Sequence, residues 1–133
     1  MQKIGGHGMH TGNYTAAAEL KFAKEAGLTL NLDDVSQLRF LPEIGGSEIL
    51  SFRINPGIGS GGMESLIVAG PDAKFGVPFE QAADGYREAQ KLGVKKFGIH
   101  MMTGSNVNEE EYFPNVVRKL FEIVAEIKKQ TGM

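Results

Sequence analysis

Runs typical of β-strands alternate with runs typical of α-helices along most of the 133-residue chain. Apolar and β-branched residues predict three strands, over residues 28–33, 48–55 and 95–102. Helix-forming residues predict four helices, over residues 14–26, 35–41, 79–92 and 112–130. Asn13 and Thr15 are the capping candidates of the first helix. Residues 1–12 are irregular and have room for the end of one more strand. Regular alternation of this kind predicts an α/β fold with parallel strands and right-handed crossovers.

Two architectures fit this order of elements. One is a small open, doubly wound sheet, and the other is three to four units of an eightfold barrel. A complete barrel usually takes about 250 residues, so this chain would supply roughly half of one. Half a barrel exposes two sheet edges and part of its core. The alternation leaves both architectures open, and we expect residues 1–133 to form a single domain.

The composition narrows the range of partners and of chemistry. The net charge is −2, and no basic cluster indicates nucleic acid or a membrane surface as a partner. No apolar run approaches the roughly 18 residues of a membrane span. The chain has no cysteine, so disulfides and thiolate chemistry are excluded, and a cytoplasmic protein is expected. His7 and His10 lie among glycines, where a helical metal pair is not expected.

Glycine is unusually common, at 18 of 133 residues, and six residues at 57–62 contain four of them. This segment begins a predicted loop over residues 57–78. It lacks the Gly-Lys-Ser/Thr ending of a P-loop and does not open directly into a helix. A loop of this length predicts either an active-site loop or an ordinary long turn.

Two predicted strands end in polar residues and glycine, in the segments 51–57 and 97–105. The carboxyl ends of parallel strands are where such proteins place their chemistry. Arg53 lies within the first strand, and a buried guanidinium needs an anionic partner, which favours a functional role. His100 lies within the other, where a satisfied core histidine and an active-site histidine are both open.

Several segments together resemble the pyridoxal-phosphate-dependent decarboxylases built on an alanine-racemase-like barrel. The resemblance is strongest to the branch that decarboxylates diaminopimelate, and it runs in the same order over residues 11–125. The segments that carry it are Thr11-Gly-Asn-Tyr-Thr15, Leu30-Asn-Leu-Asp33, Ser51-Phe-Arg-Ile-Asn-Pro-Gly57, Lys74-Phe-Gly76, and Gly98-Ile-His100 through Gly104-Ser105. It implies a partial (β/α)8 TIM barrel, roughly strands 3 to 6 with their helices.

The resemblance also implies roles for five residues. Ser105, with the backbone of Gly104, would hold the phosphate of pyridoxal phosphate, and Arg53 would lie near the cofactor. The family histidine that stacks on the pyridine ring falls at Met102. His100 lies two residues earlier on the same face of the strand, where the family also has a histidine. We therefore expect His100 and Arg53 as catalytic positions, and all five residues as cofactor-binding positions.

The implied function is that of the central part of an amino-acid decarboxylase, with diaminopimelate converted to lysine and CO2. A carboxynorspermidine-type substrate stays open, because Ser105-Asn106 is similar to that branch. The family carries its covalent lysine on the first strand, upstream of these residues, so we expect no activity from this chain alone. The intact enzyme would be a homodimer. Two alternatives are a non-catalytic half-barrel, either a remnant or a subunit needing a partner chain, and a small flavodoxin-like phosphate-binding domain.

Overall fold

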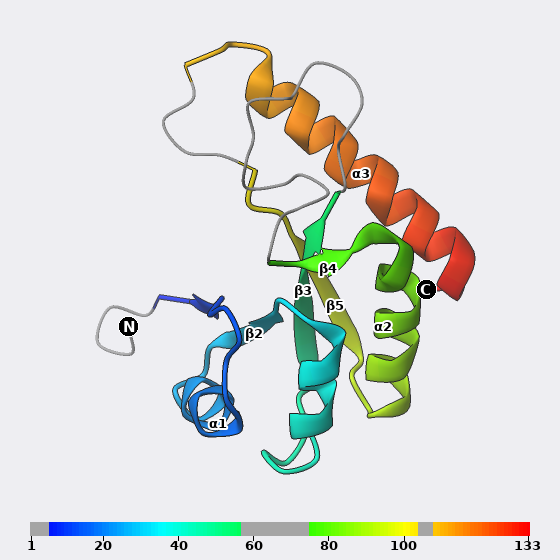
Figure 1. Ribbon diagram of the computed structural model, residues 1–133. Helices are drawn as coiled ribbons and strands as arrows, with labels where there is room; N and C mark the ends of the chain where they lie inside the picture. Colours follow the sequence, from blue (N-terminus) through cyan, green and yellow to red (C-terminus); the bar gives the residue numbers. More distant parts are fainter. Residues whose placement is uncertain (1–5, 57–74, 104–107) are drawn as a thin grey trace.

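Parallel strands that follow one another in sequence order form the sheet at the centre of the protein (Figure 1). The computed structural model describes residues 6–56, 75–103 and 108–133. Neighbours along the sheet are β1, β2 and β3, and β3 also pairs with both β4 and β5. The strands are β1 (Met9–His10), β2 (Thr29–Leu32), β3 (Ile49–Asn55), β4 (Val77–Pro78) and β5 (Lys96–His100). All four pairings are parallel, as the alternation predicts.

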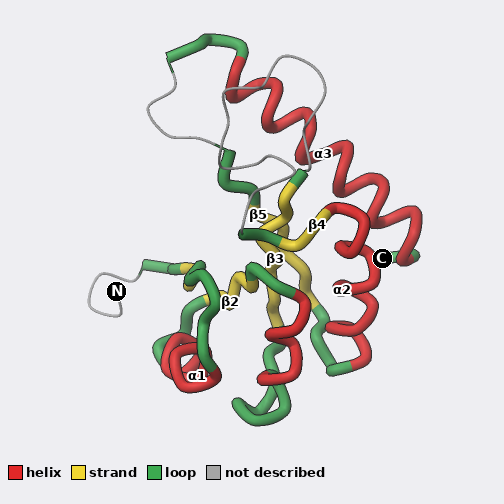
Figure 2. Tube along the Cα trace, viewed as in Figure 1, coloured by secondary structure: helices red, strands yellow, loops and turns green. Residues whose placement is uncertain are grey.

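One helix follows each of β1, β2, β4 and β5 in the chain, and the helices pack beside the sheet (Figure 2). They are α1 (Ala17–Glu25), the 3₁₀ helix η2 (Val35–Phe40), α2 (Phe79–Lys91) and α3 (Tyr112–Thr131). The predicted ends of α2 and α3 agree with the structure to within one residue at each end. None of the helices in the described part of the chain has the length and apolar character needed to cross a bilayer.

The order of the strands decides between the two predicted architectures. A doubly wound sheet reverses its strand order at a switch point, which places helices on both faces. Here the order β1, β2, β3, β5 never reverses, so right-handed crossovers put every helix on the same face. The fold is therefore a partial (β/α)8 barrel. Among the described residues β1 pairs only with β2, and β5 only with β3, so both edges of this partial barrel are open.

Alternate residues of each strand face the helices and form the hydrophobic core. Leu30, Leu32, Leu50, Phe52 and Ile54 are almost completely buried there. The intervening positions carry polar residues or glycine and face the opposite side, which is the inside of the barrel: Asn31, Ser51, Arg53, Gly98 and His100. Period-two alternation thus separates an apolar outer face from a polar inner face.

Tyr86 of α2 packs in the core on the outer face of the sheet. Its ring packs edge-on against Phe52 and Phe97, with centroids 5.1 and 5.7 Å away. Its hydroxyl donates a 2.7 Å hydrogen bond to the carbonyl oxygen of Gly98. Burial raises the pKa of Tyr86 far above its ordinary value of 10.0. Tyr86 therefore stays protonated and fixes α2 against β5.

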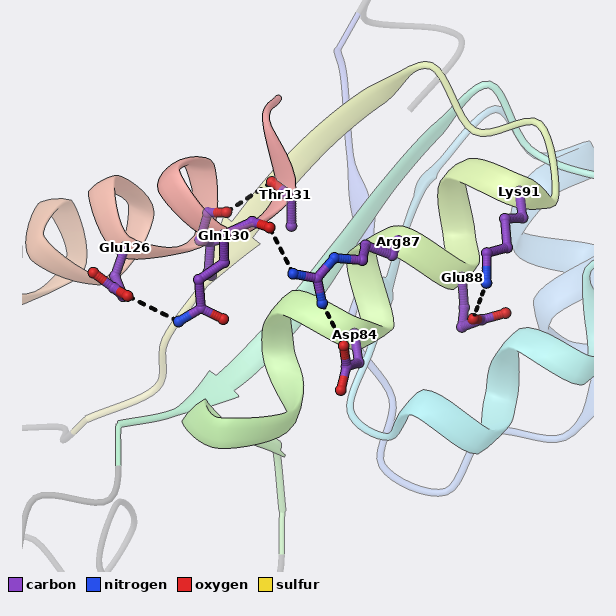
Figure 3. Close-up of polar contacts among 8 residues, drawn as sticks. Asp84, Arg87, Glu88, Lys91, Glu126, Gln130 and Thr131 are labelled. Carbon is purple, nitrogen blue, oxygen red and sulfur yellow. Dashed lines mark hydrogen bonds and ion pairs between the residues drawn. The ribbon is translucent and has the colours of Figure 1, made fainter.

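Polar contacts join the exposed sides of α2 and α3 (Figure 3). The guanidinium of Arg87 contacts the carboxylate of Asp84 in its own helix. It also donates to the backbone carbonyl of Gln130 near the end of α3. The remaining contacts that the figure draws lie within one helix, and those of Lys91 with Glu88 and of Gln130 with Glu126 are exposed. Such exposed pairs contribute little to stability, so the core residues of both helices carry most of this contact.

The predicted start of the first helix is wrong by three residues, because α1 begins at Ala17 and not at Tyr14. Tyr14 adopts a left-handed conformation with φ 51°, which helical residues do not have. Its backbone N–H donates to the carboxylate of Asp33, with the nearer oxygen 3.2 Å away. Asn13 and Thr15 do not cap the helix, because Asn13 Oδ1 accepts from Arg53 and Thr15 Oγ1 contacts His10.

Two further segments differ in detail from the sequence prediction. The helix predicted over residues 35–41 is the 3₁₀ helix η2, with Asp34 accepting a 2.7 Å hydrogen bond from the N–H of Ser36. The predicted loop 57–78 ends instead in β4, which pairs with Ile54 and Asn55 of β3. A strand of two residues has too little alternation to be predicted from sequence. The glycine-rich part of that loop lies outside the described residues.

Candidate functional site

Arg53 and His100 lie in register on neighbouring strands at the inner face of the sheet. Arg53 is the fifth residue of β3, and His100 is the last residue of β5. Parallel pairing places the carboxyl ends of both strands at the same edge, so the two side chains come from the end that carries chemistry in barrels. The structure therefore brings together the two residues that the sequence predicted as catalytic.

The guanidinium of Arg53 is almost completely buried, with only 5% of the residue exposed. It donates a 3.0 Å hydrogen bond to Oδ1 of Asn13. It also lies over the ring of Phe75, 5.6 Å from the centroid, in a cation–π contact. Within the described ranges of the chain, no carboxylate forms an ion pair with Arg53. A buried cation with neutral neighbours is an attractive partner for an anionic ligand.

Gly76 places the Phe75 ring over Arg53. Its φ of +96° is a left-handed conformation that favours glycine. A Cβ at this position would lie 3.1 Å from the backbone nitrogen of Asn55 and 3.3 Å from the carbonyl oxygen of Arg53. The absence of a side chain thus lets the segment lie directly against β3. Phe75 then packs edge-on against Tyr14 as well, with centroids 5.6 Å apart.

His100 contacts Asn31 of β2 on the inner face. Its Nδ1 lies 3.5 Å from Nδ2 of Asn31, and the same Nδ2 is 2.9 Å from Oγ1 of Thr11. Burial, and in second place the charge of Arg53, lowers the pKa of His100 below its ordinary value of 6.5. The imidazole is therefore neutral at neutral pH and carries one ring proton.

Two buried polar atoms of the inner face have no hydrogen-bond partner in the described part of the protein. They are Oδ1 of Asn31 and Oγ of Ser51, which lie on residues paired in the β2–β3 ladder. Gly98 of β5 pairs with Ser51 on the other side of β3 from Asn31. A Cβ at Gly98 would lie 3.1 Å from the Ser51 Cβ, so a larger residue would crowd Ser51. Buried atoms of this kind usually bind a ligand or water. The inner face therefore carries a cation, a neutral imidazole, one unpaired amide oxygen and one unpaired hydroxyl.

The remaining predicted site residues are placed only in part. Met102 follows the end of β5 by two residues and is 47% exposed. Gly104 and Ser105, the expected phosphate-binding residues, lie outside the described residues, as does Lys74. Across the described ranges, no group of three or more histidines and acidic residues is arranged to hold a metal ion.

The inner face contains further polar residues that were not predicted to take part in a site. Asn13, Asn31 and Ser51 all belong to segments that carry the resemblance, but they were not singled out. A signal was present, because Asn31 and Ser51 interrupt apolar strands at the inward-facing positions. A polar residue in the middle of a buried strand indicates a hydrogen-bonding task.

A separate groove of about 830 Å³ lies on the outer side, between α2, β5 and α3. Its lining is mainly apolar, with Tyr86, Phe97, Ile99, Val124 and Ile127 among the residues. It borders the open edge of β5, where a further strand and helix would continue a barrel. We attribute this groove to the uncovered edge of the partial barrel, since none of the predicted site residues lines it.

The buried cation and the neutral imidazole lie at the carboxyl ends of parallel strands, the end at which α/β-barrel proteins place their active sites. Comparison with protein families makes this specific. Residues 9–133 match the family described as pyridoxal-dependent decarboxylase, pyridoxal binding domain. The chain therefore belongs to the pyridoxal-dependent decarboxylases.

Individual relatives agree with this membership. The chain is 38% identical over 126 residues to a diaminopimelate decarboxylase of Methanothermobacter thermautotrophicus, and 33% identical over 125 residues to one of Thermoplasma acidophilum. Each alignment covers 94% of this chain but only 29% or 31% of the relative. The chain thus spans about three tenths of the length of these relatives.

A solved structure shows the same arrangement. The diaminopimelate decarboxylase of M. jannaschii, crystallised in complex with L-lysine, superimposes with a TM-score of 0.77 at 25% sequence identity. The match covers 92% of this chain and 30% of that one. These matches confirm the expected family and the partial barrel.

Proposed function

We propose that this chain is the central part of a pyridoxal-phosphate-dependent decarboxylase that converts diaminopimelate to lysine and CO2. The observation that carries the proposal is the buried guanidinium of Arg53, which faces the inside of the barrel without an ion pair in the described residues. The names of the relatives support the choice of diaminopimelate over a carboxynorspermidine-type substrate.

The described inner face fits an anionic, hydrogen-bonding cofactor. Arg53 supplies a positive charge, and the hydroxyl of Ser51 can donate to an anionic oxygen. Oδ1 of Asn31 can accept from a donor of the ligand or from water. When bound, pyridoxal phosphate supplies an electron-withdrawing ring that stabilises the negative charge left by the departing CO2. The covalent lysine for this cofactor is expected outside residues 1–133.

Each site residue has a separate task in this proposal. Arg53 holds a negatively charged group of the cofactor or substrate at the end of β3. His100 contributes a neutral imidazole that orients the ligand by a hydrogen bond and adds no charge to the site. Met102 supplies an apolar contact where the family has a stacking histidine. Ser105 and the backbone of Gly104 bind the phosphate.

The proposed partners follow from the family. The substrate is a small amino acid, in agreement with the L-lysine bound in the M. jannaschii neighbour. The intact enzyme is a homodimer. The expected cytoplasmic location stays a prediction.

A chimeric enzyme tests the proposed function. These residues replace the matching segment of the Methanothermobacter thermautotrophicus diaminopimelate decarboxylase, and CO2 release from meso-diaminopimelate is measured. We expect activity from the chimera, and loss of at least about a hundredfold in kcat/KM from the chimera with Arg53→Met, since a charged contact is worth about 3 kcal/mol.

Circular dichroism and thermal unfolding show whether each chimera is folded. A chimera with Lys91→Met is the matched control, because Lys91 is an exposed cation on α2 whose one ion pair among the described residues is with Glu88. A folded chimera without activity toward diaminopimelate contradicts the proposed substrate. Full activity after Arg53→Met contradicts the proposed role of the inner face.

A further inference from the structure

The side-chain amide of Asn31 contacts two groups through one nitrogen. Nδ2 lies 2.9 Å from the hydroxyl oxygen of Thr11 and 3.5 Å from Nδ1 of His100. An amide NH₂ has two hydrogens, so it can donate to both neighbours at once. Asn31 itself is only 1% exposed, which leaves its amide little access to solvent. The contacts therefore decide how the amide and the imidazole are oriented.

The opposite orientation of the amide is less favourable. If Oδ1 and Nδ2 exchanged places, the oxygen would accept from Thr11 and from a protonated Nδ1 of His100. The NH₂ group would then occupy the buried position where no partner is described, with two unsatisfied donors. In the observed orientation that position holds one carbonyl oxygen, which tolerates an incomplete set of partners better than an N–H does.

We propose that Asn31 is a positioning residue that fixes His100 as the tautomer with a bare Nδ1 and a protonated Nε2. Nδ1 accepts from Asn31, so the single proton of the neutral ring lies on Nε2. Thr11 takes part indirectly, because its hydroxyl accepts the other hydrogen of the Asn31 amide. The one hydrogen-bond contact of the His100 ring within the described ranges is at Nδ1, which leaves Nε2 without a partner there. His100 is thus prepared as a neutral hydrogen-bond donor.

The tautomer itself depends only on residues of this chain. The further point that Nε2–H donates to a bound cofactor or substrate rests on the function proposed above. The two parts can fail separately, since the protonation of each ring nitrogen is measured on the chain without any ligand.

Nitrogen-15 NMR of the full chain, labelled at histidine, tests the proposal. The chain has three histidines, at positions 7, 10 and 100, so their rings are readily assigned. At about pH 8, above the ordinary histidine pKa, we expect His100 to show a protonated Nε2 and a bare Nδ1. A carboxylate only accepts, so Asn31→Asp is expected to move a proton onto Nδ1. A protonated Nδ1 in the unmodified chain, or a bare Nδ1 in Asn31→Asp, overturns the proposal.

The matched control is Asn13→Asp, which makes the same chemical change next to Arg53 and away from the His100 contact. This variant is expected to leave Nδ1 of His100 bare. A proton on Nδ1 in Asn13→Asp as well would overturn the assignment of the effect to Asn31. A second measurement needs no variant. The side-chain amide signals of Asn31 should shift on acidification with the midpoint of His100, because a protonated Nδ1 no longer accepts. Asn31 amide signals that do not move with His100 contradict the contact.

Discussion

Arg53 and His100 face each other across the parallel ladder between β3 and β5. Two basic side chains in this arrangement repel each other when both are charged, and Arg53 is always charged. The structure resolves the conflict by keeping His100 neutral, through burial and through the charge of Arg53. The pair thus provides one permanent cation and one neutral hydrogen-bonding ring.

Removing the charge of Arg53 should raise the pKa of His100. In Arg53→Met the electrostatic cause of the lowered pKa is absent, while burial, the larger cause, remains. The pKa of His100 should therefore rise but stay below 6.5. An NMR pH titration of the His100 ring measures this directly. Lys91→Met removes an exposed cation of α2 and should leave the titration unchanged, and an unchanged titration in Arg53→Met would contradict the coupling.

The stability of the folded chain should fall as the solution is acidified below pH 6.5. The lowered pKa means that unfolded His100 binds a proton more readily than folded His100 does. The free energy of unfolding therefore decreases as pH falls from 6.5 toward the folded pKa, and this penalty is absent above that range. Urea unfolding at a series of pH values measures it. His100→Gln should flatten the curve in this range, and an equally steep curve would show that His100 is not the cause.

Tyr86→Phe should destabilise the fold through the loss of one hydrogen bond. The rings of Phe52 and Phe97 keep their packing partner, but the carbonyl of Gly98 loses its 2.7 Å donor. We expect the free energy of unfolding to fall by about 1–2 kcal/mol in denaturant titrations. Tyr112→Phe is the matched control, because the buried Tyr112 hydroxyl has no partner in the described residues. Equal losses in the two variants would argue against the importance of the Gly98 contact.

Gly76→Ala should destabilise the fold and disturb the aromatic contact on Arg53. An alanine would be strained at the φ of +96°, and its methyl group would lie too close to the backbone of β3. We expect a loss of about 1–3 kcal/mol in thermal or denaturant unfolding. Gly93→Ala has a similar φ of +91° but meets nothing within 4 Å, so it shows the cost of the conformation alone. A cost for Gly76→Ala no larger than for Gly93→Ala would mean that the contact with β3 is unimportant.

The alternation of elements was predictable because it depends on local periodicity. The cores of α2 and α3 and the strands β2, β3 and β5 are strongly patterned, so their sequence positions agree with the structure. The start of α1 was not predictable from local sequence. Asn13 and Thr15 are good capping residues, but Asn13 accepts from Arg53, 40 positions away, and Thr15 contacts His10 on the preceding strand.

For the site as well, features set by local sequence were predictable and contacts between distant residues were not. Arg53 and His100 could be found from sequence, because a cation and a histidine in apolar strands are chemically conspicuous. The contact between Asn31 and His100 could not, since these residues are 69 positions apart and come together only when β2 and β5 pair on either side of β3. The alternation of elements left the barrel and the open sheet undecided. The family resemblance implied the barrel, and the order of the strands agrees with it.

The central claim is that the cofactor binds at the inner face of the partial barrel. The most direct test is a titration of the labelled full chain with 4′-deoxypyridoxine 5′-phosphate, followed by NMR. This analogue lacks the aldehyde, so it forms no imines with surface lysines. We predict saturable shifts at the inward-facing residues Asn31, Arg53 and His100, with the outward-facing Phe52 and Ile99 unaffected. No saturable shift, or shifts confined to the helix-covered face, would contradict the account.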